Sequence, residues 1–250
     1  MRAWWTAAMT VLLLAGLATA GTAQDLIPDG DFEAESSSRS LRVDNKGPDW
    51  QETRKDGPEG RKLLFLSTKE IAGNATQKAM IKAHPEKNTY LSRYLGDPQR
   101  GIFSVRVDIL VKEILDDDNR TAFIMLGNDR DNKRGPCSTG KERLVFLGFE
   151  NAEAEGKMNL FARERGTGWS ETTRVAGDLE LGKWYTIRMM IYVMDESYEV
   201  WVDGVTKPRE VEGFRMRPKT GKAITHISFA SWNDGAGTFY VDNVAAEVVE

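Results

Sequence analysis

The sequence is poor in cysteine, is not strongly basic, and has no long apolar run beyond its first residues. Cys137 is the one cysteine among 250 residues, which excludes an intrachain disulfide. It lies far from the chain start, which disfavours a bacterial lipid anchor. After residue 23 no apolar stretch approaches the roughly 18 residues that span a bilayer. Stability must therefore come from a large core, with a bound metal as a further option.

The first twenty-three residues have the composition of an export signal. Arg2 supplies a positive charge, residues 7–17 are apolar, and the small residues 21–23 form a cleavage site. We therefore expect residues 1–23 to be removed and the protein to be secreted or periplasmic. Residues 24–250 are expected to form one domain.

The charge balance excludes nucleic acid as the expected partner. The chain has 34 Lys and Arg against 38 Asp and Glu. Arg2 is the one charged residue of the signal, so the mature chain keeps 33 basic residues and a formal charge of −5. Nucleic-acid binding favours a clearly basic face. We expect a monomer that spans no membrane.

The rest of the chain alternates short apolar segments with clusters of Gly, Asp and Asn, and it shows no helical period. This pattern is typical of an all-β sandwich or barrel. Segment 36–60 is polar and predicts a long exposed connection, and 76–94 is predicted to hold a short helix. Nine strands are predicted, at residues 63–66, 102–111, 121–126, 143–149, 158–162, 184–194, 198–203, 223–231 and 238–248.

Alternation of side chains is clearest in the predicted hairpin of residues 184–194 and 198–203. Odd-numbered positions of the first strand and even-numbered positions of the second are apolar and should face a core. Segment 224–231 repeats the arrangement. We therefore expect three strands that each have an apolar face and a polar face with aromatic side chains.

Four motifs resemble the concanavalin A-like, laminin-G-like jelly rolls. They are Gly-Lys-Trp-Tyr-Thr-Ile-Arg at 182–188, Tyr-Glu-Val-Trp-Val-Asp-Gly at 198–204, Ile-Ser-Phe at 227–229 and Gly-Thr-Phe-Tyr-Val-Asp-Asn-Val at 237–244. Residues 26–33 are similar to the first strand of many bacterial carbohydrate-binding and polysaccharide-degrading jelly rolls. The resemblance implies an all-β, two-sheet antiparallel jelly-roll sandwich.

The same resemblance implies a glycan as ligand, bound across one sheet. The superfamily includes lectins, glycan-binding modules, glycoside hydrolases and polysaccharide lyases, so the fold alone does not select among them. The chain lacks the Glu-x-Asp-x-x-Glu strand of the hydrolases. An enzyme of this kind would therefore be a lyase rather than a hydrolase.

Sugar recognition combines an aromatic surface with planar polar groups, and the polar strand faces supply both. Non-covalent polysaccharide binding is the first of three hypotheses for the function. The third is a cell-surface module of laminin-G type that binds a protein partner. The alternative to any site is that these side chains cover solvent-facing strands. The predicted ligand-binding residues are Arg106, Arg163, Trp201, Trp232 and Trp169.

A polysaccharide lyase is the second hypothesis, because arginine forks match the carboxylate or sulfate groups of an anionic polysaccharide. In β-elimination, Arg188 or Arg106 would neutralise the carboxylate of a uronate. His226 or Tyr192 would act as base and acid. A structural role for His226 is the alternative.

A structural calcium ion is implied by the resemblance, since such an ion joins the first and last strands of many related jelly rolls. The matching positions here are Asp31, Glu33 and Asp242. Carboxylates suit Ca²⁺, which takes about 6–8 oxygen ligands. The alternative makes Asp242 a turn residue or a hydrogen-bond acceptor.

Overall fold

A computed structural model describes residues 25–34, 50–53, 63–84, 88–115, 120–128, 143–164, 172–215, 222–231 and 237–249. These ranges form strands and turns and contain no helix, so they hold no helix that could cross a membrane. The strands are β1 (Trp50–Thr53), β2 (Leu64–Ser67), β3 (Lys78–Lys82), β4 (Thr89–Gln99), β5 (Ile102–Ile114), β6 (Arg120–Gly127), β7 (Arg143–Asn151), β8 (Lys157–Arg163), β9 (Thr172–Glu180), β10 (Trp184–Tyr192), β11 (Ser197–Val202), β12 (Arg209–Val211), β13 (Ile224–Ser231) and β14 (Gly237–Val249).

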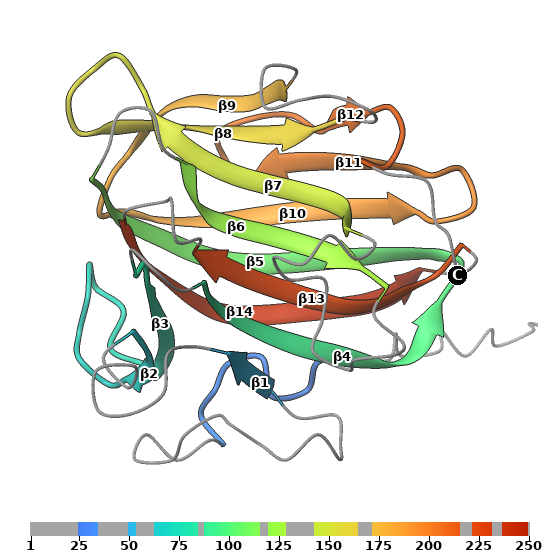
Figure 1. The fold of residues 1–250 in the computed structure, drawn as a ribbon, viewed down its shortest axis with the longest axis horizontal. Coiled ribbons are helices and arrows are strands. Elements are labelled where there is room, and N and C mark those ends of the chain that lie inside the picture. The colour runs from blue at the N-terminus through green and yellow to red at the C-terminus, as the bar shows by residue number, and fades with distance from the viewer. Residues whose placement is uncertain are drawn as a thin grey trace, which may run out of the picture.

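The strands form two antiparallel sheets that pack face to face (Figure 1). The β13 sheet has the order β1-β4-β13-β6-β7-β8-β9, and the β10 sheet has the order β12-β11-β10-β5-β14-β3-β2. Neighbours such as β4 and β13, or β5 and β14, are far apart in the sequence. The architecture confirms the predicted all-β, two-sheet antiparallel sandwich.

The core fills the space between the sheets and follows the predicted alternation. On β10, Ile187 and Met189 are fully buried and join the main apolar cluster, while the intervening Arg188 points away from it. On β13, Ile227 and Phe229 enter the same cluster. Period two therefore sorts the side chains of both sheets into an inward apolar set and an outward set.

All nine predicted strands are present, as β2, β5 to β8, β10, β11, β13 and β14. The predicted helix in 76–94 is wrong, because this segment contributes β3 and the first half of β4. The expected exposed connection 36–60 needs correction at β1, where Trp50 is fully buried. The rest of that connection lies outside the described residues, as do the export signal and Cys137.

The segment that resembles a first strand is mostly turns, and it is held against β14. Leu26 N donates to Ala246 O at 2.7 Å, and Val244 N donates to Gly30 O at 2.9 Å. A Cβ atom on Gly30 would lie 1.7 Å from Val244 O, so only glycine permits this approach. The start of the described chain is thus fastened to its last strand.

Candidate functional site

The predicted site residues lie on the outer faces of two different sheets, where an outer face is the one that points away from the core. The β10 sheet carries Arg106, Arg188, Tyr192 and Trp201. The β13 sheet carries Arg163 and His226. Their predicted grouping in one groove is therefore corrected. The two-residue alternation of side chains shows which residues share a face of one strand, but it does not show which sheet that strand joins.

On the β10 sheet, Arg188 and Trp201 are cross-strand neighbours. Both donate to one carboxylate: Arg188 Nε lies 2.6 Å from Asp203 Oδ2, and Trp201 Nε1 lies 3.1 Å from Asp203 Oδ1. The structure brings these two residues together around an internal acid. A ligand carboxylate would compete with Asp203 for Arg188.

Arg106 is satisfied in the same way. Its Nη2 lies 3.1 Å from Asp108 Oδ2, and Asp108 also accepts from Thr186 Oγ1 at 2.6 Å and from Asn243 Nδ2 at 2.9 Å. Side chains of Arg106 and Arg188 are 43 % and 44 % exposed, so water screens both pairs. This outer face therefore balances its own charge.

Tyr192 occupies the far end of the β10 strand, across from Ile102 of β5. Burial and the neighbouring carboxylate of Glu199 raise the pKa of its hydroxyl. Tyr192 therefore keeps its proton at neutral pH and is a poor base there.

The outer face of the β13 sheet has an apolar cluster of its own, separate from the main core. Gly148 of β7 lies beneath it: a Cβ atom there would approach ring atoms of Phe161 at 2.7 Å and of Phe123 at 2.8 Å. The missing side chain lets the two rings lie over the strand. We call this cluster the aromatic floor; its members are Tyr90, Phe123, Met125, Phe146, Phe161 and Ala230.

Arginine side chains surround the aromatic floor. The guanidinium carbons of Arg143, Arg163 and Arg215 lie 5.8, 5.5 and 5.4 Å from the ring centroid of Phe146. These distances are within the range of cation–π contacts. The three arginines come from β7, β8 and the segment after β12, where Arg215 N also donates to Leu144 O at 2.8 Å.

Arg120 completes this group, which we call the arginine cluster. Its guanidinium carbon lies 4.4 Å from the ring centroid of Phe161, and its Nε donates to Glu150 Oε2 at 2.7 Å. Burial, together with the charges of Arg215 and Arg120, lowers the pKa of Arg163 to about 10. The cluster thus concentrates positive charge in a place with little water.

Sequence analysis found Arg163 but missed Arg120, Arg143 and Arg215. The available signal was the two-residue spacing of Phe161 and Arg163, which puts a ring and a guanidinium on one strand face. No spacing predicts that Arg215 crosses to β7, because it lies after a strand of the other sheet.

His226 lies in a row of outward positions that crosses the β13 sheet. Its ring centroid is 5.1 Å from that of Tyr94, and its Nδ1 lies 2.8 Å from Thr225 Oγ1. Across the sheet, His226 is paired with Gly127, which in turn is paired with Arg143. Gly127 puts no side chain between His226 and Arg143. His226 is only 1 % exposed.

The carboxylates of the predicted calcium ligands Asp31, Glu33 and Asp242 each accept hydrogen bonds from the protein. Asp242 Oδ2 accepts from Asn74 Nδ2 and Thr76 Oγ1, both at 2.8 Å, and its Oδ1 accepts from Asn243 N at 2.8 Å. Glu33 Oε1 accepts from Gln77 N at 2.5 Å. Asp31 Oδ1 accepts from Glu33 N within a turn. Among the described residues, no three His, Cys, Asp or Glu side chains gather as metal ligands do.

A lysine ammonium supplies the positive charge at this place. Lys78 is fully buried, and its Nζ donates to the carbonyl oxygens of Lys69 and Thr76. Burial lowers the pKa of Lys78, while the charges of Asp242 and Glu33 act in the opposite direction. A calcium ion would need oxygens that already accept from N–H and O–H groups, so these residues fit an ammonium rather than Ca²⁺.

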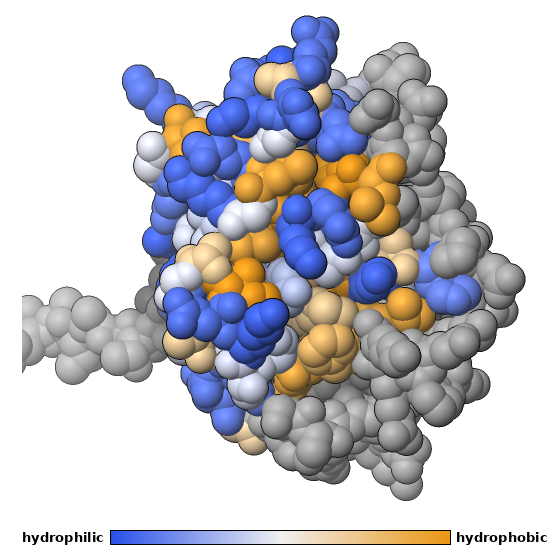
Figure 2. All heavy atoms as spheres, turned by 90° about the vertical axis from the view of Figure 1, so that its left-hand side faces the viewer, coloured by the Kyte–Doolittle hydropathy of each residue, from blue (hydrophilic) through white to orange (hydrophobic). Residues whose placement is uncertain are grey.

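The surface does not gather its apolar side chains into one patch on the side that Figure 2 shows, where hydrophilic and hydrophobic residues are interspersed. Large exposed apolar residues of the described chain include Phe65, Leu115, Met194 and Val205, which come from separate segments, and Ile102 and Val249, which are paired across β5 and β14. Trp169 and Trp232 lie outside the described residues.

Comparisons with solved structures establish the fold. A carbohydrate esterase from Shiga toxin-encoding bacteriophage phi24B matches 80 % of this chain and 90 % of its own, with 10 % identity and a TM-score of 0.55. A sialidase matches 80 % of this chain but 17 % of its own, with 15 % identity and a TM-score of 0.50. The carbohydrate recognition domain of Emp47p matches 83 % of this chain and 91 % of its own, with 12 % identity and a TM-score of 0.48.

No protein-family model matches the sequence, and no curated protein matches it either. At 15 % identity or less, the structural matches speak for the fold alone. The chain has the concanavalin A-like jelly-roll fold, as its motifs predicted.

Proposed function

We propose that this protein is secreted and binds a polysaccharide non-covalently on the outer face of the β13 sheet. The observation that carries the proposal is the half-buried ring of Tyr94, which lies on this face beside hydrogen-bonding side chains and over a sheet whose aromatic floor is itself buried. Ser92 and Ser228 face each other with their hydroxyl oxygens 2.8 Å apart, and Tyr94 and His226 follow in the next outward row.

The chemistry of a sugar explains why this combination matters. A pyranose has an apolar face that packs on aromatic rings and hydroxyls that need planar or hydroxyl partners. The β10 sheet offers Trp201, but the indole N–H and its arginine neighbour are already bound to Asp203. The β13 sheet therefore supports binding better than the face predicted from the sequence.

Location and domain organisation belong to the same proposal. The export-signal composition of residues 1–23 supports secretion, and a polysaccharide outside the cell suits that compartment. Residues 24–250 would then act as one binding domain.

A glycan array tests the proposal and locates the site. We expect binding by the mature chain and a loss of about fivefold in Tyr94→Ala, since stacking on one ring contributes on the order of 1 kcal/mol. Arg209→Gln, on the exposed edge strand β12 of the other sheet, is the control. A loss in Trp201→Ala with unchanged Tyr94→Ala would place the site on the β10 sheet, and no binding to any glycan would refute the proposal.

Polysaccharide lyase activity is the second candidate, favoured by the row of Tyr94, His226 and Arg143. A uronate bound over Gly127 would meet a guanidinium for its carboxylate on one side and an imidazole for its proton on the other. Incubation with uronate polysaccharides should then raise the ultraviolet absorbance of unsaturated ends, and His226→Gln should abolish the rise. Binding without any such rise leaves the non-covalent function alone.

A further inference from the structure

Lys78 is a fully buried charged residue on the outer face of the β10 sheet. The next residue, Ala79, points into the main core, so Lys78 points the other way. Met80 is paired with Tyr240 of β14. Two residues further along these two strands, Lys78 and Asp242 therefore share the outer face. A lysine that is buried on such a face needs groups that bind its ammonium.

The turn between β2 and β3 lies against this position. Asn74 Nδ2 of the turn donates to Asp242 Oδ2 at 2.8 Å. The N-terminal segment reaches the same turn, where Glu33 Oε1 accepts from Gln77 N at 2.5 Å. Three segments that are distant in the sequence therefore meet around Lys78: the start of the described chain, the β2–β3 turn and β14.

The surroundings of the Lys78 ammonium resemble those of a bound cation. Its Nζ donates to the carbonyl oxygens of Lys69 and Thr76, both in the turn. The carboxylates of Asp242 and Glu33 lie close enough for their charges to act on the ammonium. Carbonyl and carboxylate oxygens are also the ligands that hard metal ions take in proteins. The difference is that this cation is covalently attached to β3.

The spacing of these oxygens favours the ammonium over calcium. Lys78 Nζ lies 3.1 Å from Lys69 O, an ordinary hydrogen-bond length. Calcium takes its oxygen ligands at about 2.3–2.6 Å. Asp242 Oδ2 already accepts two hydrogen bonds, from Asn74 and Thr76. A calcium ion here would require the side chain of Lys78 to leave and these contacts to shorten.

We infer that the Lys78 ammonium is a built-in replacement for a bound metal ion, which joins the first described segment, the β2–β3 turn and the last strand and makes the fold independent of divalent cations. This inference departs from the calcium site that the resemblance implies at Asp31, Glu33 and Asp242. A bound ion stabilises a protein only as far as its concentration exceeds its dissociation constant. A tethered ammonium supplies its charge at any concentration.

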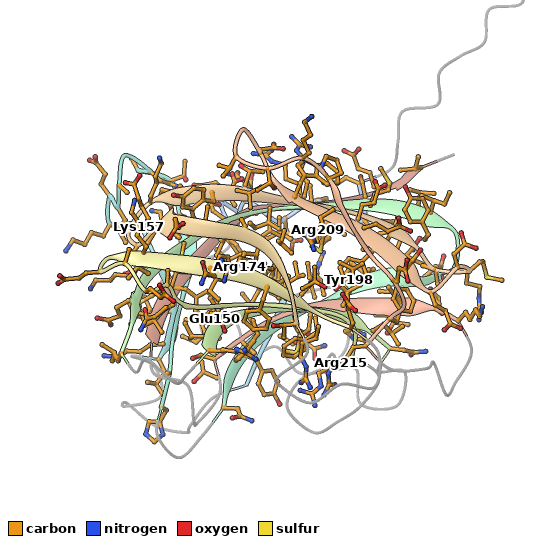
Figure 3. All side chains as sticks on the ribbon, turned by 90° about the horizontal axis from the view of Figure 1, so that it is seen from above. Glu150, Lys157, Arg174, Tyr198, Arg209 and Arg215 are labelled. Carbon is orange, nitrogen blue, oxygen red and sulfur yellow. The ribbon has the colours of Figure 1, made fainter. Side chains whose placement is uncertain are left out.

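The inference does not depend on the proposed function, because Lys78 is on the other sheet. Lys78 and Asp242 belong to β3 and β14 of the β10 sheet. In Figure 3, Arg209 of the same sheet lies in the upper half of the molecule, whereas Arg215, whose guanidinium lies against Phe146 of the β13 sheet, points out of the lower layer. Changes at Lys78 therefore test stability without altering the face on which we propose that polysaccharide binds.

Thermal unfolding of the mature chain, followed by circular dichroism, tests the independence from divalent cations. The melting temperature of the wild type should differ by less than about 1 °C between EDTA and millimolar calcium chloride at equal ionic strength. Lys78→Ala should lower it by about 10 °C, because Asp242 loses its counter-charge. Lys82→Ala, at an exposed position of the same strand, is the control and should change it by less than about 2 °C. A wild type that melts higher in calcium than in EDTA, or a Lys78→Ala variant as stable as Lys82→Ala, would overturn the inference.

Chemical rescue tests whether the place left by Lys78 accepts a free cation. Lys78→Ala removes the methylene groups beyond Cβ together with the ammonium, and n-propylammonium matches the removed part. This amine should raise the melting temperature of Lys78→Ala by at least about 3 °C. It should not raise that of Lys78→Met, whose side chain fills the space without a charge, and propan-1-ol at the same concentration should have no such effect on Lys78→Ala.

Rescue of Lys78→Ala by neither n-propylammonium nor calcium would overturn the inference. An equal rise with propan-1-ol, or in Lys78→Met, would overturn it too, since the charge would then not matter. If Lys78→Ala does not fold, refolding from urea with and without n-propylammonium decides the question: recovery only with the amine supports the inference, and no recovery in either case overturns it.

Discussion

The two outer faces of the sandwich use the same residue types to opposite effect. On the β10 sheet, Arg188 and Arg106 each have an aspartate within hydrogen-bond distance. On the β13 sheet, the guanidinium groups of Arg143, Arg163 and Arg215 share one aromatic ring. The arginines of the two faces therefore differ in their contacts: those of the β10 sheet pair with aspartates, and those of the β13 sheet lie against an aromatic ring.

Local sequence accounts for the charge pairing on the outer face of the β10 sheet, which we call the balanced face. Arg106 and Asp108 are two residues apart on β5, and Trp201 and Asp203 are two residues apart at the end of β11. In a strand such residues share a face, so each donor meets its acceptor without help from the fold. The arginine cluster has no such pattern, since its members come from four separate segments.

The largest loss of stability is expected for Lys78→Met, because this change removes the buried positive charge that lies near Asp242. Asp242 would stay buried with its charge uncompensated, and we expect the free energy of unfolding to fall by about 3 kcal/mol in urea titrations at neutral pH. Lys82→Met, at an exposed position of the same strand, is the control and should change it by less than about 0.5 kcal/mol. Similar small losses in both variants would contradict the assigned role of Lys78.

A smaller loss is expected when the aromatic floor is disturbed. In Gly148→Ala the new methyl group meets two ring atoms closer than 3 Å, and moving both rings should cost about 2 kcal/mol of unfolding free energy. Gly177→Ala is the matched change on β9, where the nearest atoms lie at 3.4 Å or beyond. Thermal unfolding of both variants measures the difference. If Gly148→Ala is as stable as Gly177→Ala, the rings are not held as described.

The smallest effect should come from breaking a pair on the balanced face. Asp203→Asn removes the counter-charge of Arg188 and should cost about 0.5 kcal/mol of unfolding free energy, because both side chains are well exposed. The freed guanidinium should then give the β10 sheet weak affinity for sulfate, detectable as a low-affinity site. If this variant binds no additional sulfate, the pairing of Arg188 with Asp203 is not what prevents the β10 sheet from binding sulfate.

Much of the scaffold could be predicted from the sequence, because strands such as β10 and β11 alternate strictly and carry Asp-Gly or similar turns. β3 and β4 were missed for a physical reason: they include Lys78, Arg93 and Pro98, and charged or cyclic residues hide the apolar period. Lys78 is tolerated inside the protein only because carbonyls and acids from other segments surround it.

The candidate site was predicted less well than the fold. Alternation identified His226, Arg163 and Trp201 as outward residues, and the structure agrees on each strand separately. Assignment of strands to sheets depends on long-range pairing, such as that of β13 with β4 and β6. Such pairing leaves no local signature, so residues of opposite sheets were combined into one site.

The backbone hydrogen bond between Val244 and Gly30 also limits when this protein can finish folding. Backbone atoms more than two hundred positions apart must meet before the first described segment has a partner. Closing so long a loop is entropically unfavourable until the sheets between them exist. A ribosome would therefore have to release almost the whole polypeptide before the sandwich could close.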